Sequence, residues 1–233
     1  MKHPKIHAPS VFGLFACLLA LLAFGTSTRA DLVDLNNITD SQKALLAEHV
    51  FGGLPSQDNI YIRQGYILSY NPQTKTPKWV AYHIKPEYGD TPARKGKFKT
   101  FRNDPDMEEE ARDADYNGLF TSRGYAGGHL APYGVMGGDR DGDGQLAKDG
   151  DADDEITVFQ SNYMGNIAPQ HHYGFNGSPG LWYKLERWVQ YALVKKQGKE
   201  VWVFAGSIFG PGEHEKVGQG KASGSCPCFT RLW

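Results

Sequence analysis

The chain has 233 residues, of which 40% are hydrophobic and 22% are charged, and its formal net charge is −1. This length is enough for one domain with a full hydrophobic core. The near-neutral charge is unpromising for a protein that binds nucleic acid through an overall basic surface, so such a function would need a local basic face.

Residues 1–30 have the layout of a secretory signal. Two lysines give a positive start, an apolar run follows from Val11 to Phe24, and Thr28-Arg29-Ala30 offers small residues at the positions that a signal peptidase reads. The apolar run is short for a transmembrane helix, and a retained anchor is the alternative. We expect a secreted or periplasmic protein whose mature form, residues 31–233, is a single domain free of the membrane.

The first half of the mature chain predicts a helix and then a β-hairpin. Ser41 to Val50 is amphipathic and predicts a short helix. Tyr61 to Tyr70 and Trp79 to Ile84 are β-rich and flank a turn sequence, Asn71 to Pro77. The polar stretch from Lys85 to Asp115 predicts a loop with short helical pieces.

The second half mixes strands and helices. Ile156 to Tyr163 predicts a strand, and Val201 to Phe204 is typical of a buried strand. Leu181 to Lys196 carries apolar residues at helical spacing, and Gly198 stands where a C-cap glycine would end that helix. Without βαβ regularity, repeats or a linker, this order predicts one α+β domain.

Four polar residues in the second half form a chemically coherent set: His129, Asn166, Asn176 and Glu186. Two glycines precede the histidine and leave its imidazole unobstructed. Phosphodiester hydrolysis needs a base for water, a cation beside the phosphate and support for the charge on the leaving oxygen. An amide oxygen and a water-linked carboxylate can hold Mg²⁺. Taken singly, the same residues are as well explained as a surface histidine, turn asparagines and a solvated glutamate.

These residues stand in motifs with a fixed order: His129-Leu130-Ala131-Pro132, Asn166-Ile167-Ala168-Pro169-Gln170, Asn176 and Leu185-Glu186. Together they resemble the DNA/RNA non-specific endonucleases, which are ββα-metal nucleases. Segments similar to other parts of that family are Phe101 to Pro105, Asp115-Tyr116, Gly65 to Tyr70 with Trp79 to Tyr82, and Val201 to Gly206. The resemblance covers nearly all of the mature chain and implies a mixed or antiparallel sheet core with a ββα-metal active-site unit.

The resemblance implies a Mg²⁺-dependent enzyme, in which Mn²⁺ can substitute, that hydrolyses DNA and RNA and leaves 5′-phosphates. His129 resembles the general base that activates water, and Arg102 resembles the arginine that stabilises the pentacovalent phosphate. Asn176 is similar to the direct metal ligand, and Glu186 to the carboxylate that holds the metal's waters. Asn166 resembles the residue that orients the histidine side of the site. The existence of a proteinaceous inhibitor is left open.

The chain departs from the family pattern just before the histidine. The usual Asp-Arg-Gly is Ala126-Gly127-Gly128 here, so Gly127 replaces an arginine that would grip phosphate. Arg123, four residues before Gly127, is a candidate substitute contact, and the chain ends at Trp233, where relatives usually continue. Three alternatives follow: a catalytically weakened relative that binds nucleic acid or a partner, a phosphodiesterase of small substrates, and a secreted calcium-binding module.

An acidic insertion, residues 137–155, enlarges the spacing between the histidine and asparagine motifs. Residues 1–30 carry three basic and no acidic residues, so the mature chain has a net charge of −4. Asp139 to Glu155 carries −6 of this, which leaves +2 on the rest of the mature chain. Carboxylates at alternate positions followed by glycine match the start of a calcium loop, and no helix is predicted on either side. We expect a structural Ca²⁺ there, with a solvated acidic loop as the alternative. The candidate calcium ligands are Asp139, Asp141, Asp143, Gln145, Asp149 and Asp151.

Two cysteines, Cys226 and Cys228, remain after removal of the signal. A disulfide between residues so close in sequence would be strained, and a metal site would need further ligands that the neighbouring sequence does not offer. Two interpretations stay open: residues of a terminal strand, or an oxidised or intermolecular pair in an oxidising compartment.

Overall fold

The computed structural model describes residues 33–108, 110–120 and 124–209, together with the backbone of three short strands nearer the C-terminus. Three expectations lie outside the described residues: the signal at residues 1–30, the phosphate contact of Arg123, and the state of Cys226 and Cys228. Within the described part of the chain, no helix is long and apolar enough to cross a membrane.

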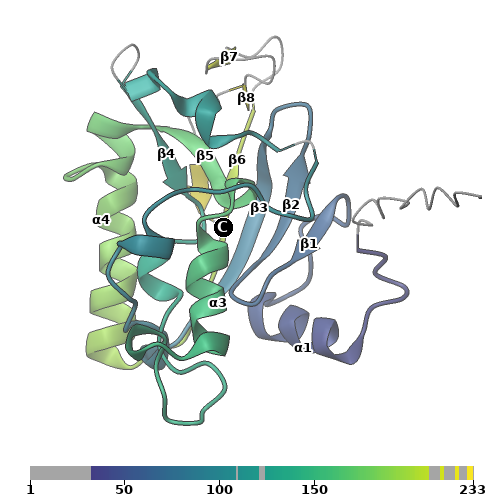
Figure 1. Ribbon diagram of the computed structural model, residues 1–233, viewed down its shortest axis with the longest axis vertical. Coiled ribbons are helices and arrows are strands. Elements are labelled where there is room, and N and C mark those ends of the chain that lie inside the picture. Colours follow the sequence, from purple (N-terminus) through teal and green to yellow (C-terminus); the bar gives the residue numbers. More distant parts are fainter. Residues whose placement is uncertain are drawn as a thin grey trace, which may run out of the picture.

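A five-stranded antiparallel sheet runs through the molecule (Figure 1). The predicted hairpin is confirmed as β2–β3, in which Leu68 pairs with Val80. The predicted β-rich run 61–70 is divided into two strands, because the chain turns back and Ile62 pairs with Ile67. In spatial order the strands are β1 (Ile60–Ile62), β2 (Ile67–Asn71), β3 (Thr76–Ile84), β6 (Val201–Ser207) and β9 (Thr230–Leu232).

The two faces of this sheet bury different hydrophobic clusters. Successive side chains of a strand point to opposite faces. Accordingly, Leu68 and Val80 belong to the larger cluster, whereas Ile67 and Ala81 belong to the smaller one. Both faces of the sheet are therefore covered. Because successive side chains of β2 and β3 enter different clusters and most are apolar, these strands look like nearly continuous apolar runs in the sequence.

Helix α1 (Asp40–His49) covers the smaller cluster and confirms the predicted first helix. Its Leu45 and Leu46 pack against the sheet. Thr39 caps the helix, since its hydroxyl accepts from the Gln42 amide at 3.2 Å while the Gln42 side chain accepts from the Thr39 amide at 2.9 Å. This reciprocal pair satisfies two backbone donors at the helix start.

The opposite face carries the segments of the candidate site. They are β4 (Tyr125–His129), α3 (Ala152–Ser161), β5 (Ile167–His171) and α4 (Leu181–Arg187). α4 continues as a π-helical segment, η8 (Trp188–Lys195), and ends before Gly198, whose φ of +62° stops it as predicted. In Figure 1, α4 and α1 lie on opposite sides of the molecule, with the strands of the sheet between them. The α+β class is confirmed.

The predicted strand at residues 156–163 is wrong, because most of this segment lies in helix α3. Its buried residues Thr157, Val158 and Ser161 follow helical spacing. Carboxylates fill the first turn of α3, where negative charge stabilises a helix N-terminus. A short apolar run does not by itself distinguish a strand from a buried helix. The same helix corrects the expectation that no helix flanks the acidic insertion.

Short helical segments fill the connections, and between Lys85 and Asp115 they agree with the predicted loop with short helical pieces. These segments are η1 (Pro86–Tyr88), η2 (Gly96–Phe98), η3 (Asp113–Tyr116), η4 (Tyr133–Val135), η5 (Ala147–Asp149), η6 (Met164–Asn166) and η7 (His172–Asn176). The remaining strands are β7 (Lys216–Val217) and β8 (Gly224–Ser225), which pair with each other.

Candidate active site

The β4–β5 hairpin fixes the backbone around His129. The residue ends β4 opposite Ile167, and the next amide, that of Leu130, donates to the Asn166 carbonyl at 3.0 Å. Gln170 on β5 donates from Nε2 to the His129 carbonyl at 3.4 Å. The Gln170 side chain also lies over Gly128, where an added Cβ would overlap it. A larger residue at position 128 would therefore have to displace the Gln170 side chain.

The imidazole of His129 is held by Asn162, directly after α3. Its Nε2 lies 3.1 Å from Asn162 Oδ1. Asn162 is fully buried and donates from Nδ2 to the Phe98 carbonyl at 3.2 Å, which directs Oδ1 toward the imidazole. Arg94 donates from Nη2 to the same oxygen at 3.3 Å. Because Oδ1 only accepts, Nε2 carries the imidazole proton and Nδ1 is the basic nitrogen.

The charge state of His129 follows from these surroundings. Burial lowers the pKa of His129 from 6.5 to about 4, and the positive charge of Arg94 acts in the same direction. The imidazole is therefore neutral around neutral pH. A neutral imidazole with a fixed tautomer is the form that can accept a proton from water.

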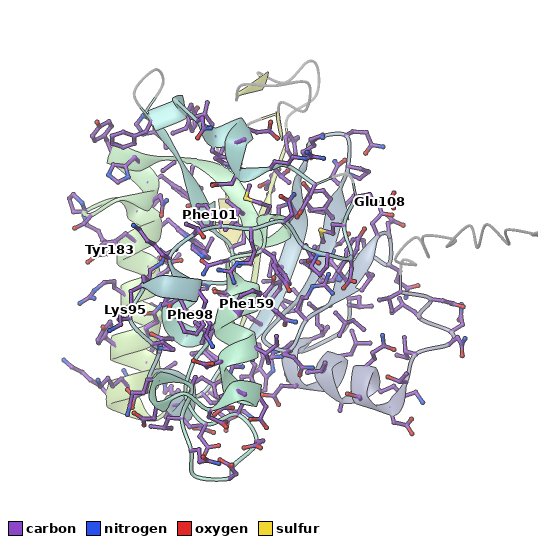
Figure 2. All side chains as sticks on the ribbon, viewed as in Figure 1. Lys95, Phe98, Phe101, Glu108, Phe159 and Tyr183 are labelled. Carbon is purple, nitrogen blue, oxygen red and sulfur yellow. The ribbon has the colours of Figure 1, made fainter. Side chains whose placement is uncertain are left out.

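An aromatic ring stands beside the histidine where the family pattern has an arginine. The Phe101 and His129 ring centroids are 5.3 Å apart. A Cβ at Gly127 would lie 2.8 Å from the Phe101 ring, so this ring lies where a longer side chain would begin. Figure 2 shows Phe101 in the same region of the molecule as Phe98 and Phe159, beside α3.

Asn166 acts on the backbone around the histidine. It is fully buried; its Oδ1 accepts from the Ala131 amide at 2.8 Å, and its Nδ2 donates to the Ala131 carbonyl at 2.9 Å and the Ser161 carbonyl at 2.8 Å. These bonds tie the exit of β4 to the end of α3. The side chain that contacts the imidazole is Asn162, which was not predicted; an asparagine four residues before Asn166 was the available signal.

Asn176 and Glu186 lie on two helical segments that pack together. Asn176 ends η7, and the neighbouring Phe175 stacks on Trp182 of α4 with centroids 6.0 Å apart. Glu186 lines a small cavity together with Pro132, in the segment that follows the histidine. α4 thus brings the carboxyl to the histidine side of the site.

The donor atoms of these two residues are of the kind that bind a divalent cation. Burial raises the pKa of Glu186 from 4.5 to about 8, and among the described residues no basic side chain forms an ion pair with it. A buried carboxylate is costly unless a positive charge compensates it. Amide and carboxylate oxygens are the ligands that Mg²⁺ prefers. The donor chemistry of Asn176 and Glu186 therefore suits such an ion.

Two arginines contact the segments that hold the imidazole, in different environments. Arg94 bonds to Asn162 and has its guanidinium 4.9 Å from the centroid of the Tyr133 ring. Arg102 donates to the carbonyls of Lys97 and Thr100, and its guanidinium lies 3.6 Å from the centroid of the Phe159 ring. The backbone amide of Arg102 also donates to the Asn162 carbonyl at 3.0 Å. Of the two, only Arg102 was predicted, because Arg94 stands in a polar stretch without a distinguishing pattern.

The sequence model of the DNA/RNA non-specific endonuclease family matches residues 47–225. The chain belongs to this family. The matched range includes β4, α3, β5 and α4, and with them every described residue of the candidate site.

Relatives with a described activity include nucleases from animals, a fungus and a bacterium. Mitochondrial nuclease EXOG of Xenopus laevis is 28% identical over 184 residues, which cover 78% of this chain and 44% of that protein. Nuclease C1 of Cunninghamella echinulata var. echinulata is 30% identical over 166 residues, 69% of this chain and 56% of that protein. The nuclease of Serratia marcescens is 28% identical over 151 residues, 64% of this chain and 48% of that protein. The chain spans about half the length of these curated relatives.

A solved structure shares the fold. The crystal structure of the EndoG/EndoGI complex, which concerns the inhibition of EndoG, superposes with a TM-score of 0.59 at 22% identity, covering 82% of this chain and 71% of that chain. This likeness confirms the expected ββα-metal nuclease fold.

Proposed function

We propose that the protein is a metal-dependent endonuclease that hydrolyses phosphodiester bonds of DNA and RNA without strong sequence preference, with His129 as the general base. The observation that carries the proposal is the neutral imidazole whose Nε2 is fixed on Asn162 and whose Nδ1 is basic. Membership of the family supports the reaction class, because the matched relatives are nucleases.

The proposed reaction begins with proton transfer from water to Nδ1 of His129. The water oxygen forms a bond to phosphorus, and the bond from phosphorus to the 3′-oxygen breaks. The leaving 3′-oxygen takes a proton from solvent, His129 returns its proton to solvent, and the products carry a 5′-phosphate and a 3′-hydroxyl. A positioned base of this kind contributes about two to four decades in rate. Asn166 supports the step by fixing the backbone beside the base.

Mg²⁺, for which Mn²⁺ can substitute, would be held directly by the amide oxygen of Asn176 and through bound water by Glu186. When bound, the ion stabilises the charge on the leaving oxygen. The half-buried carboxyl of Glu186, whose pKa is raised, supports this assignment, because a cation would offset the cost of removing its charge from water.

A positive side chain is also needed for the charge that develops on the phosphate. We favour Arg94 for this role, because its guanidinium shares Asn162 Oδ1 with the imidazole. Arg102, the residue indicated by the family resemblance, bonds through Nη2 to the Lys97 and Thr100 carbonyls, and its Nη1 is buried without a hydrogen-bond partner among the described residues, so it stays the alternative.

The test is a cleavage assay on supercoiled plasmid and on RNA, with Mg²⁺ and with EDTA. We expect both substrates to be cut only with the metal, and His129→Ala to lose about a hundredfold or more in rate without loss of folding. Glu186→Gln should instead raise the Mg²⁺ concentration needed for half-maximal rate, whereas His129→Ala should leave that concentration unchanged. Cleavage by His129→Ala at more than about a tenth of the wild-type rate would show that His129 is not the base.

One observation favours a second candidate, a weakened relative that binds nucleic acid. Gly127 lacks the side chain that would grip phosphate, and Phe101 lies where it would begin. Retention of plasmid binding without any metal-dependent cleavage would support that alternative. For location we propose export, on the basis of residues 1–30; fractionation of cells that express the full chain tests this.

A further inference from the structure

The acidic insertion brings three carboxylates together. Ligand oxygens of Asp139, Asp141 and Asp143 lie within 4.8 Å of one another. The loop turns back on itself at Gly142 and Gly144, whose φ angles of +82° and +89° favour glycine. In Figure 1 this loop extends from the lower end of α3. Exposed acidic groups can cluster without binding anything, so this geometry alone does not identify a site.

A fourth carboxylate gives independent evidence for a ligand. Asp154, in the first turn of α3, is 1% exposed. Its Oδ1 accepts from the amide of Arg140 at 2.8 Å, which brings the carboxyl against the loop between two of its aspartates. Its Oδ2 is buried and has no hydrogen-bond partner among the described residues.

The basic side chains of the insertion do not supply the missing positive charge. The guanidinium of Arg140 donates to the Val135 carbonyl at 2.8 Å and lies 3.7 Å from the centroid of the Tyr88 ring. Lys148 pairs with Asp149 at 2.8 Å. A buried carboxylate oxygen beside other carboxylates, without a cation, is strongly unfavourable.

We propose that this loop binds a structural Ca²⁺ ion through the carboxylates of Asp139, Asp141, Asp143 and Asp154 and the backbone carbonyl of Gln145. Ca²⁺ accepts six to eight oxygen ligands in flexible geometry, whereas Mg²⁺ requires a near-ideal octahedron of closer ligands and retains its waters. A cavity beside the loop is lined by Asp141, Asp153 and Asp154, and also by Lys85 and Arg140.

The structure changes the set of ligands expected from the sequence. In the proposed site Asp149 stays paired with Lys148, and Asp154, whose carboxyl meets the loop at the Arg140 amide, moves in to complete the ligand set when the ion binds. Asp151 stays a candidate, because its Oδ2 is also buried without a partner among the described residues. The loop is therefore closed by the helix that follows it.

The proposed ion is structural, because α3 separates it from the site. Asp154 lies in the first turn of this helix, and Asn162, the partner of the His129 imidazole, directly follows its last residue. A helix of ten residues is about 15 Å long. Ca²⁺ would stabilise the start of the helix whose end positions the base, and this proposal does not depend on the protein being an active nuclease.

The experiment is a calcium titration of the mature protein, by calorimetry and thermal unfolding, in saturating Mg²⁺. We expect Ca²⁺ to bind and to raise the melting temperature. Asp141→Asn combined with Asp143→Asn should abolish the rise, and Asp149→Asn, in the same loop, should leave it unchanged. Absence of calcium binding to the wild type, or an unchanged rise in the double variant, overturns the proposal.

Two further variants test the role of Asp154 and the location of the ion. Without Ca²⁺, Asp154→Asn should raise the melting temperature, because it removes a buried charge that no cation compensates. The affinity of this variant for Ca²⁺ should be roughly tenfold or more below that of the wild type, since the number of charged ligands sets affinity. A lower melting temperature in both conditions would mean that Asp154 is only a structural residue. A calcium response that is lost in Asn176→Ala but kept in the double variant would locate the ion at the candidate active site.

Discussion

Protonation of His129 couples the chemistry of the site to the acid stability of the fold. The base acts only when neutral, and its pKa is about 4. We therefore expect the rate of RNA cleavage at saturating Mg²⁺ to fall as the pH drops through about 4, instead of through the ordinary range of histidine. A half-maximal rate near pH 6.5, the ordinary value, would show that the pKa of the imidazole is not lowered in the active protein.

The stability effect has a definite sign. In the unfolded chain the histidine has its ordinary pKa of 6.5, so the unfolded state takes up a proton before the folded state does. This residue therefore lowers the free energy of unfolding as the pH falls from 6.5 toward 4, and contributes nothing above that range. Urea unfolding of the wild type and of His129→Gln across this pH range tests the expectation, because the free energy of unfolding of the variant should fall less steeply with decreasing pH.

Substitution of Arg94 and of Arg102 should have different effects on the rate and on the stability of the protein. Arg94→Ala removes the cation that shares Asn162 with the base, and we expect a loss of about a hundredfold or more in kcat at saturating Mg²⁺. Arg102→Ala removes bonds to two carbonyls and a ring contact, so we expect mainly a lower melting temperature. Steady-state rates and thermal unfolding of both variants test these expectations. A large loss of kcat in Arg102→Ala with little change in Arg94→Ala would show that Arg102 stabilises the charge on the phosphate.

At the scale of elements, the β4–β5 hairpin depends on the absence of a side chain. A methyl group at Gly128 would overlap Gln170, so Gly128→Ala should lower the free energy of unfolding by about 1–3 kcal/mol. Gly134→Ala is the matched control, because a Cβ there meets Gln190 only at 3.5 Å. Chemical denaturation measures both. Equal losses in the two variants would mean that the hairpin tolerates the extra group.

At the scale of the whole molecule, a buried ion pair joins the segment around Arg102 and Asp104 to the sheet. Arg63, in the turn between β1 and β2, donates to Asp104 from Nη2 at 2.6 Å and from Nε at 2.9 Å. Asp104→Ala leaves that guanidinium buried and should lower the free energy of unfolding by about 3–5 kcal/mol. Asp106, whose side chain is 53% exposed, also contacts Arg63, and Asp106→Ala should cost less than about 1 kcal/mol. If denaturant unfolding shows similar losses of stability for Asp104→Ala and Asp106→Ala, Asp104 is not the main partner of Arg63.

The sequence by itself determined the features that depend on local pattern. The β-rich runs and turn sequence of the β2–β3 hairpin, the apolar spacing in α4 and the glycine that ends its continuation are read from neighbouring residues. The order of the histidine, asparagine and glutamate motifs pointed to the family that the comparison then identified. Each of these signals can be recognised in the sequence without knowing which residues meet in the folded chain.

Only the tertiary structure decided which side chains meet. Asn162 and Asn166 are both buried and four residues apart, and the way α3 meets β4 determines that Asn162 contacts the imidazole while Asn166 bonds to backbone. Arg94 reaches the site from a polar stretch without periodicity. α3 was wrongly predicted as a strand because a short apolar run fits a strand or a helix equally well, and its packing supplied the difference. Without that helix, the buried carboxyl of Asp154 could not be placed against the acidic loop.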